Sequence, residues 1–355
     1  MRAASNPPAP TGGATPRWVA RARPERYINV LGLPLVIVLL CLYFGTQSDN
    51  FFTESNFQNI GRNIAALALL ALAEAVVIVI GQIDLSVGAA LGLISVIVVL
   101  AVDQFGPAAG FVAAPVAGLA IGLVNGLLVT WLRVHAVIVT IGSLTAISGL
   151  ALVITNGTPV TADLPKAMTW LGDGQVASVP VPMIVAATAF AAMAFVFRLT
   201  VFGPKLYATG GNEEAARLAG IDTRRVQIAA FCIAGLLAGV AALLLTGRIR
   251  SGQPTLGAGL ELEAVAAAVV GGMALTGGRG TIGGVALGVA LLTVLQNGLD
   301  ITNVSSYWQE VVIGLVIFFA LATDYVRRSR PATRSAGGGG APPPSAAPAP
   351  AAGAP

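Results

Sequence analysis

The sequence predicts an all-α membrane protein with about ten transmembrane helices and with both termini in the cytoplasm. Only 10% of its 355 residues are charged and its mean hydropathy is +0.82, whereas soluble domains carry roughly 25% charged residues. Apolar runs of about 20 residues, the length that crosses a bilayer, recur along the chain. In the resulting arrangement, 16 of the 20 Lys and Arg residues fall on the cytoplasmic side, as the positive-inside rule requires.

The chain divides into a basic tail, a membrane domain and a low-complexity end. Residues 1–27 hold five arginines and precede an apolar run without a convincing cleavage site, so we interpret them as a cytoplasmic tail. Residues 28–326 form the membrane domain, and the Pro/Ala/Gly-rich segment 327–355 is predicted to be a disordered cytoplasmic tail. The apolar runs predict helices at 28–45, 63–81, 85–102, 107–131, 136–155, 182–200, 226–246, 260–276, 281–299 and 307–326. The run 260–276 is short and interrupted by glycine, which makes it a candidate for a tilted or re-entrant segment.

The stretch "GQIDLSVG", residues 81–88, leaves almost no loop between the second and third predicted helices. Gly81 and Gly88 allow a tight turn there. Asp84 can cap the following helix with its side-chain oxygen. We therefore predict a structural hairpin that consists of Gly81, Asp84, Ser86 and Gly88.

A water-soluble stretch, "GGNEEAARLAGI", interrupts the apolar middle of the chain at residues 210–221. It predicts a short cytoplasmic helix from Glu213 to Ala219, with Asn212 as its N-cap and Gly220 as a left-handed C-terminal cap. Glu213 and Arg217 are four residues apart and are predicted to pair. A helix this short is marginal in water, so we expect it to dock into a groove on another protein. The predicted docking residues are Gly211, Asn212, Glu213, Glu214, Ala215, Ala216, Arg217, Leu218, Gly220 and Ile221.

Residues that could support catalysis are scarce. A phosphate-binding P-loop needs Gly-Lys followed by Ser or Thr, but Lys166 and Lys205 each follow a proline. The one histidine, His135, lies at a predicted helix end, and Cys41 and Cys232 lie inside apolar runs. We therefore expect no enzyme activity, no metal site and no cofactor.

Four polar side chains are predicted to lie inside the bilayer: Glu74, Asn125, Gln296 and Asn297. A carboxylate at that depth costs at least about 2.5–3.5 kcal/mol on insertion scales. Glu74 is therefore either a residue of a solute pathway, a proton carrier or an internally bonded packing residue. The three amides suit hydroxyl groups but equally suit helix association. No arginine lies deep in a predicted helix, which favours a neutral, hydroxyl-rich solute.

Four segments, in order along the chain, resemble one family. They are "GQIDLSVG", "GGNEEAARLAGI", "LEAVAAAVVGGMALTGGRGTIGGVALG" at 262–288 and "YWQEVVIGLVIFFALATD" at 307–324. Over about 30–326 the chain is similar to ribose-type permeases, the membrane subunits of ATP-binding-cassette (ABC) sugar importers. Gln82 departs from the glycine that is usual in that family, and we expect this to affect the tightness of the hairpin.

The resemblance implies a permease subunit in the bacterial plasma (inner) membrane that pairs with a second copy. A separate cytoplasmic ATPase subunit would drive it and an extracytoplasmic solute-binding protein would deliver a monosaccharide such as ribose or xylose. The short helix would then insert into a groove of the ATPase. Three alternatives stay open: an ion-coupled secondary transporter that uses Glu74, a structural scaffold, or an ABC permease for nucleosides, branched-chain amino acids or autoinducer-like sugars.

Overall fold

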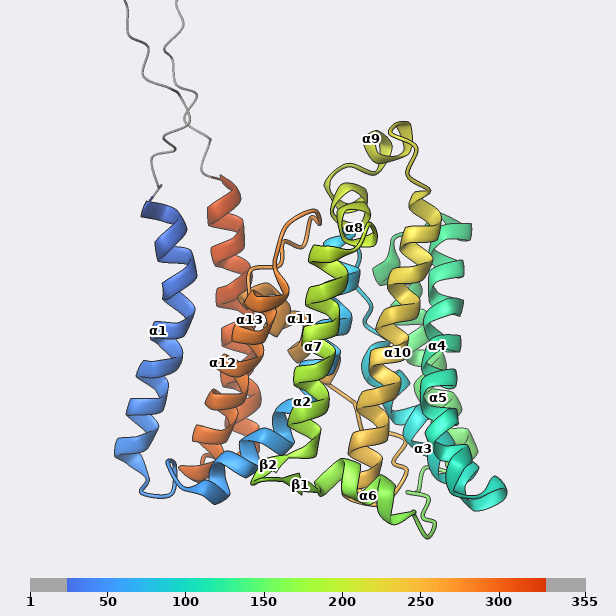
Figure 1. Cartoon of the computed structure of the whole chain (residues 1–355), viewed down its shortest axis with the longest axis vertical. Coiled ribbons are helices and arrows are strands. Elements are labelled where there is room, and N and C mark those ends of the chain that lie inside the picture. The colour runs from blue at the N-terminus through green and yellow to red at the C-terminus, as the bar shows by residue number, and fades with distance from the viewer. Residues whose placement is uncertain (1–23, 330–355) are drawn as a thin grey trace, which may run out of the picture.

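The computed structural model describes residues 24–329, which form a bundle of helices that run side by side (Figure 1). Most of the two predicted tails, 1–27 and 327–355, lies outside the described residues. The helices are α1 (Pro24–Gln47), α2 (Glu54–Val79), α3 (Val87–Phe105), α4 (Pro107–Leu132), α5 (Ala136–Thr155), α6 (Lys166–Asp173), α7 (Val181–Leu199), α8 (Phe202–Gly211), α9 (Glu213–Leu218), α10 (Thr223–Ile249), α11 (Leu260–Val270), α12 (Ile282–Ile301) and α13 (Ser306–Ser329). One antiparallel ribbon pairs β1 (Gln175–Val176) with β2 (Val179–Pro180).

Seven of the described helices are long and apolar enough to cross a membrane, and each matches a predicted helix. They are α2, α3, α4, α5, α7, α10 and α12, and a shorter apolar stretch, Gly32–Gln47, lies in α1. The predicted helix 260–276 is wrong in length. The helix there, α11, has 11 residues, which is about 16 Å and too short for a hydrocarbon core of about 30 Å.

The two ends of the bundle carry different elements, and we name them by these elements (Figure 1). The α9 face carries α8 and α9, and the α6 face carries α6, β1 and β2. The elements α6, α8 and the β ribbon lie in segments for which the sequence predicts no regular structure. The sequence also predicts the start of the second helix at residue 63, nine residues after the observed start at Glu54, where Thr53 accepts a hydrogen bond from the Asn56 N–H.

The centre of the bundle is built around α2 and α10. From Ala65 to Val79, every residue of α2 is buried. The helices α10 and α4 approach closely through glycine, since a Cβ added at Gly118 would overlap the carbonyl oxygen of Gly235 and the reverse also holds. Small residues at such crossings replace the hydrophobic driving force that is missing between helices in lipid.

Candidate functional site

The chain leaves helical geometry between α2 and α3 while it is still inside the bundle. Gly81 makes the turn with φ +79°. The next residues follow α5: the Gln82 side-chain oxygen accepts the N–H of Ala136 at 3.2 Å, and the Leu85 N–H donates to Thr140 Oγ1 at 3.2 Å. Segment 80–86 is a seven-residue connection between α2 and α3, with turns at 80–81 and 85–86 and no regular structure between them. It starts near the α9 face and follows the first turns of α5 deeper into the bundle, with Gly81 at the predicted turn.

A second non-helical segment, which consists mainly of turns, lies between α10 and α11. After α10, residues 251–259 follow α3 into the bundle, with Ser95 Oγ donating to the carbonyl oxygen of Gln253 and accepting its N–H, both at 3.0 Å. Gly257 meets Gly88 so closely that a Cβ on either glycine would overlap the backbone of the other. Both α3 and α11 consequently start inside the bundle. In membrane proteins, non-helical backbone at this depth occurs only where it is buried in protein or lines a water-filled cavity.

A chain of hydrogen bonds joins segment 80–86 to α4 and α5. Asp84 Oδ1 accepts the N–H of Ser86 at 3.0 Å and its hydroxyl at 2.6 Å. Asn125 donates to Ser86 Oγ at 2.7 Å, and its own carbonyl oxygen accepts the hydroxyl of Ser143 at 2.6 Å. The prediction that Asp84 caps α3 is wrong: Ser86 is the N-cap residue, without a side-chain cap, and Asp84 instead holds Ser86 in place.

Glu74 lies on α2 beside segment 80–86 and is fully buried. One carboxyl oxygen accepts the N–H of Asp84 at 3.4 Å, and the other has no hydrogen-bond partner. The ion pairs among residues 24–329 involve other groups. A buried carboxyl group that lacks a cation is costly unless it stays neutral, and its free oxygen makes Glu74 a candidate for contact with a polar solute or a proton.

The other two predicted pathway residues lie apart from Glu74 and Asn125. Gln296 donates to Glu263 Oε2 at 2.8 Å and so ties α12 to α11. Asn297 and Asn56 exchange two amide hydrogen bonds of 3.0 and 2.8 Å between α12 and α2. The four residues therefore do not form one site, and the Asn297–Asn56 pair matches the helix-association alternative.

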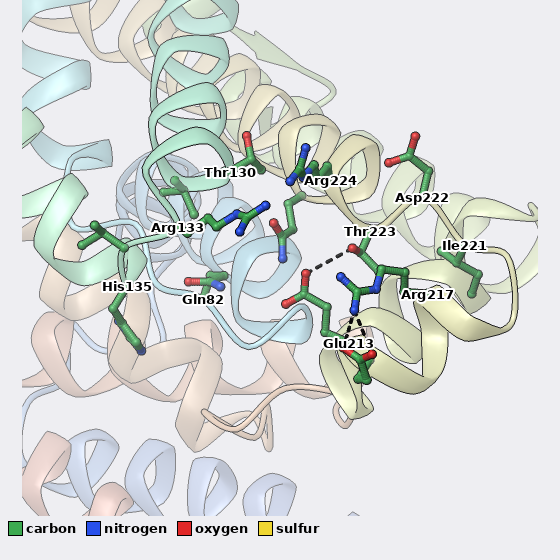
Figure 2. Close-up of a pocket in the computed structure, with 14 residues that line it drawn as sticks. Gln82, Thr130, Arg133, His135, Glu213, Arg217, Ile221, Asp222, Thr223 and Arg224 are labelled. Carbon is green, nitrogen blue, oxygen red and sulfur yellow. Dashed lines mark hydrogen bonds and ion pairs between the residues drawn. The ribbon is translucent and has the colours of Figure 1, made fainter.

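The short helix α9 projects from the bundle next to a cavity of about 870 Å³ (Figure 2). Asn212 accepts the Ala215 N–H at 2.9 Å and Gly220 has φ +85°, so both predicted caps are confirmed. The predicted Glu213–Arg217 pair is wrong, because Arg217 pairs with Glu214 at 2.7 Å and Glu213 accepts the Thr223 hydroxyl at 3.1 Å. The cavity reaches from α9 to Gln82 and to Arg133 and His135 in the turn between α4 and α5.

The surface of α9 differs from the prediction in one important respect. Ala216 is only 5% exposed, since it packs against the chain itself, while Leu218 is 81% exposed. Ala215, Arg217 and Ala219 are also exposed. Any partner that contacts α9 therefore meets Leu218 and its exposed neighbours, and Ala216 instead holds the helix in place.

Four polar residues near segments 80–86 and 251–259 were not predicted from the sequence. They are Thr140, Ser143, Glu261 and Glu263. Thr140 and Ser143 lie in the apolar run 136–155. In the sequence they look like ordinary small residues of a membrane helix. Glu261 and Glu263 could have been recognised from the sequence, because two carboxylates there precede a short apolar segment that is flanked by glycine.

An apolar groove of about 700 Å³ lies between α4 and α5. Half of the residues of α5 are exposed, and nothing lies within 4 Å of where Gly142 and Gly149 would carry a Cβ. Asn125 and Ser143, from the hydrogen-bond chain above, line the same groove. This face of the bundle thus combines small residues with a polar strip.

Comparison with known proteins gives a consistent result. Residues 56–321 match the family model described as "Branched-chain amino acid transport system / permease component". The chain is 38% identical over 294 residues to the ribose import permease protein RbsC of Escherichia coli K12, covering 82% of this chain and 92% of that protein. It is 36% identical to the probable ABC transporter permease protein YphD of the same strain, covering 86% and 92%. It is 32% identical to the L-arabinose ABC transporter permease protein AraH of Azospirillum brasilense, covering 91% and 95%. No solved structure matches the chain.

Proposed function

This chain belongs to the branched-chain amino acid transport system / permease component family, and from that premise we propose that it is the sugar-translocating membrane subunit of an ABC importer. Its relatives include permeases named for ribose, L-arabinose and autoinducer 2. It is a multi-pass protein of the inner membrane. The observation that carries the proposal is the pair of non-helical segments, 80–86 and 251–259, of which the first leads into α3 and the second packs against the start of α3 inside the bundle, with polar side chains around them.

We assign the α9 face to the cytoplasm and the α6 face to the outside. The charge distribution supports this orientation, because Arg198, Lys205, Arg217, Arg224 and Arg225 cluster around α8 and α9. With this orientation the described helices fit ten membrane segments, if α11 and the non-helical segment 251–259 before it together count as one. Both termini, including the tails 1–27 and 327–355, would then lie in the cytoplasm.

The ATPase subunit is proposed to bind at α9. The helix is capped at both ends, carries an exposed Leu218 and stands beside a large cavity that leads to Gln82 and α5. The chain has no Gly-Lys-Ser/Thr sequence, which supports ATP hydrolysis on another subunit. The residues from Gly211 to Ile221 that the sequence analysis selected form the proposed docking element, with Ala216 as internal support.

A second permease copy is proposed to cover the face formed by α4 and α5. Gly142 and Gly149 are open to close approach by another helix. Asn125 and Ser143 would face a polar passage between the two copies rather than lipid. The solute-binding protein is proposed to dock on the α6 face. Among the predicted pathway residues we place Glu74 and Asn125 beside the passage, and Gln296 and Asn297 in helix association.

One observation favours a second candidate, an ion-coupled secondary transporter: the unpartnered oxygen of buried Glu74. Uptake of radiolabelled D-ribose and L-arabinose into proteoliposomes separates the two. The importer needs ATP, the ATPase and the binding protein. The secondary transporter needs only this chain and a pH gradient.

The variant Glu74→Gln completes this test. It keeps the oxygen that accepts the Asp84 N–H but cannot carry a proton. If Glu74 contacts solute, ATP-driven uptake falls or its sugar preference changes, while the ATPase still co-purifies. If Glu74→Gln takes up every sugar at the wild-type rate, Glu74 is a packing residue and does not contact solute. Uptake by the isolated chain that follows the pH gradient and is lost in Glu74→Gln would refute the importer.

A further inference from the structure

A small cavity lies where residues 254–258 pack against the start of α3, away from the polar residues that the sequence singled out. It has a volume of about 90 Å³. Its walls come from the start of α3, from one side of α5, from residues 254–258 and from the first turn of α11. The polar groups in these walls are the Ser148 hydroxyl, the Thr255 hydroxyl and the Glu261 carboxylate.

The depth of the cavity follows from helix geometry. Ser148 is the thirteenth residue of α5, about 18 Å along a helix of about 30 Å. Glu261 is at the same level, because a Cβ on Gly88 would overlap its carboxyl oxygen and Gly88 lines the cavity as well. The three polar groups thus lie within the thickness of the hydrocarbon core and not at its edge.

The surrounding protein leaves unused hydrogen-bonding capacity on each of these polar groups. The hydroxyls of Ser148 and Thr255 make no side-chain hydrogen bond to any residue in the range 24–329. The Glu261 carboxylate accepts only the Gly259 N–H, at 3.1 and 3.3 Å, and the ion pairs of the described chain lie elsewhere. All three side chains are at least partly exposed. Lipid cannot satisfy them, so they must face water, another chain or a solute.

The chemistry of the cavity matches a neutral polyol. A carboxylate without a cationic partner accepts two hydroxyl donors, and serine and threonine hydroxyls both donate and accept. Leu144 and Leu152, one turn on each side of Ser148, offer apolar contact for the carbon face of a sugar ring. A water needs roughly 10–15 Å³ measured in this way, so the cavity holds about six to nine water-sized groups, the scale of one monosaccharide.

We propose that Glu261, Ser148 and Thr255 form a contact site for a monosaccharide on its way through the permease. Glu261 would accept two sugar hydroxyls, and the two hydroxyl side chains would exchange hydrogen bonds with the rest of the ring. The site rests on the proposed import function. Glu74 differs from Glu261 in being fully buried and bonded to the backbone of segment 80–86, so Glu261 is the carboxylate that solute reaches first.

Uptake and ATPase activity together test the site. Wild type, Glu261→Gln and the matched control Glu310→Gln, whose carboxylate is exposed on α13, are reconstituted with the ATPase and the binding protein. Glu261→Gln is expected to lower uptake of radiolabelled D-ribose and L-arabinose about tenfold, the loss expected for one charge-assisted hydrogen bond. Its ATPase stimulation by the loaded binding protein should stay at the wild-type level, as should both activities of Glu310→Gln.

Cysteine labelling provides a readout that does not require transport. In a background with Cys41→Ala and Cys232→Ala, Ser148→Cys should react with a water-soluble maleimide, and D-ribose with the binding protein should slow that reaction. Ala191→Cys, exposed at the middle of α7, should stay unlabelled because it faces lipid.

The outcomes separate this site from the import function. Wild-type uptake by Glu261→Gln, or absence of labelling at Ser148→Cys with and without ATP, overturns the site and leaves import intact. A wild-type protein that takes up no sugar with ATP refutes import itself. Loss of both uptake and ATPase stimulation in Glu261→Gln also overturns the site, since it assigns Glu261 to folding or coupling.

Discussion

The surface of α9 allows the docking proposal to be tested with a single side chain. Leu218 is 81% exposed, and full burial of a leucine side chain contributes about 1.5–3 kcal/mol. If the ATPase covers what is now exposed, Leu218 contributes about 1.2–2.4 kcal/mol to binding, which is 81% of that range. Leu218→Ala should then weaken the complex by up to about 8- to 60-fold, and Leu218→Asp by more because a carboxylate would also lose its water.

The assay is co-purification of the ATPase with the detergent-solubilised permease, followed by titration to obtain Kd. The matched control is Leu199→Ala, because Leu199 is also a highly exposed leucine near the α9 face but belongs to α7. Leu218→Ala should lower affinity without a change in the thermal stability of the isolated permease, since its side chain packs against little of the bundle. Leu199→Ala should change neither quantity.

A wild-type Kd for Leu218→Asp would refute the proposal that this surface of α9 binds the ATPase. Ala216→Arg, which the sequence alone would favour as the test, answers a different question. Ala216 is buried against its own chain and its carbonyl oxygen accepts the Ile221 N–H at 3.0 Å. A bulky charge there would displace α9 itself, and the loss of ATPase binding would not distinguish docking from local unfolding.

Two further predictions concern the bundle. Ser143→Ala removes the donor to the Asn125 carbonyl oxygen and should lower the free energy of unfolding by about 1–3 kcal/mol, the cost of an unsatisfied buried acceptor. A double-mutant cycle with Asn125→Ala, measured by thermal unfolding, should show that the two stability losses are coupled. Strictly additive losses would contradict the hydrogen-bond chain. An enzyme that is active only outside the membrane should give no signal when fused after Asp324 and a strong signal when inserted at Asp163 before α6; the reverse pattern would invert the orientation.

Hydropathy was sufficient to locate the long helices, because each must bury about 20 apolar residues in lipid regardless of its neighbours. Seven of them appear where the apolar runs predict. Hydropathy could not show where the backbone leaves the helix inside the bundle. Segment 80–86 and segment 251–259 are short and flanked by apolar runs, and the second holds three glycines and a proline, so they look like turns at the membrane surface. Their depth is set by hydrogen bonds to α3 and α5, which are distant in sequence.

Local rules succeeded where the interaction is local. The caps of α9 depend on Asn212 and Gly220 within a few residues, and both were predicted from the sequence. The partner of Arg217 was wrong because Glu213 bonds to Thr223 on α10, a contact that helix spacing alone does not contain. Asp84 was wrong for a related reason: an aspartate near a helix start suits a cap, but here Ser86, Asn125 and Ser143 make a more extensive set of bonds.

The position of Gln82 explains how movement at α9 could reach the centre of the bundle. Gln82 lines the same cavity as Glu213 and Arg217, and its side chain holds the first N–H of α5. One turn further, Thr140 accepts the Leu85 N–H, and in the next turn of α5 Ser143 donates to Asn125, which in turn donates to Ser86. The first two turns of α5 are thus attached to segment 80–86 directly at two levels and through Asn125 at a third. A shift of α9 that alters the cavity changes the support of α5 and of segment 80–86 together, because neither can move without breaking bonds to the other. Through Gln82, the cavity beside α9 is therefore connected to the start of α5 and to the segment that leads into α3.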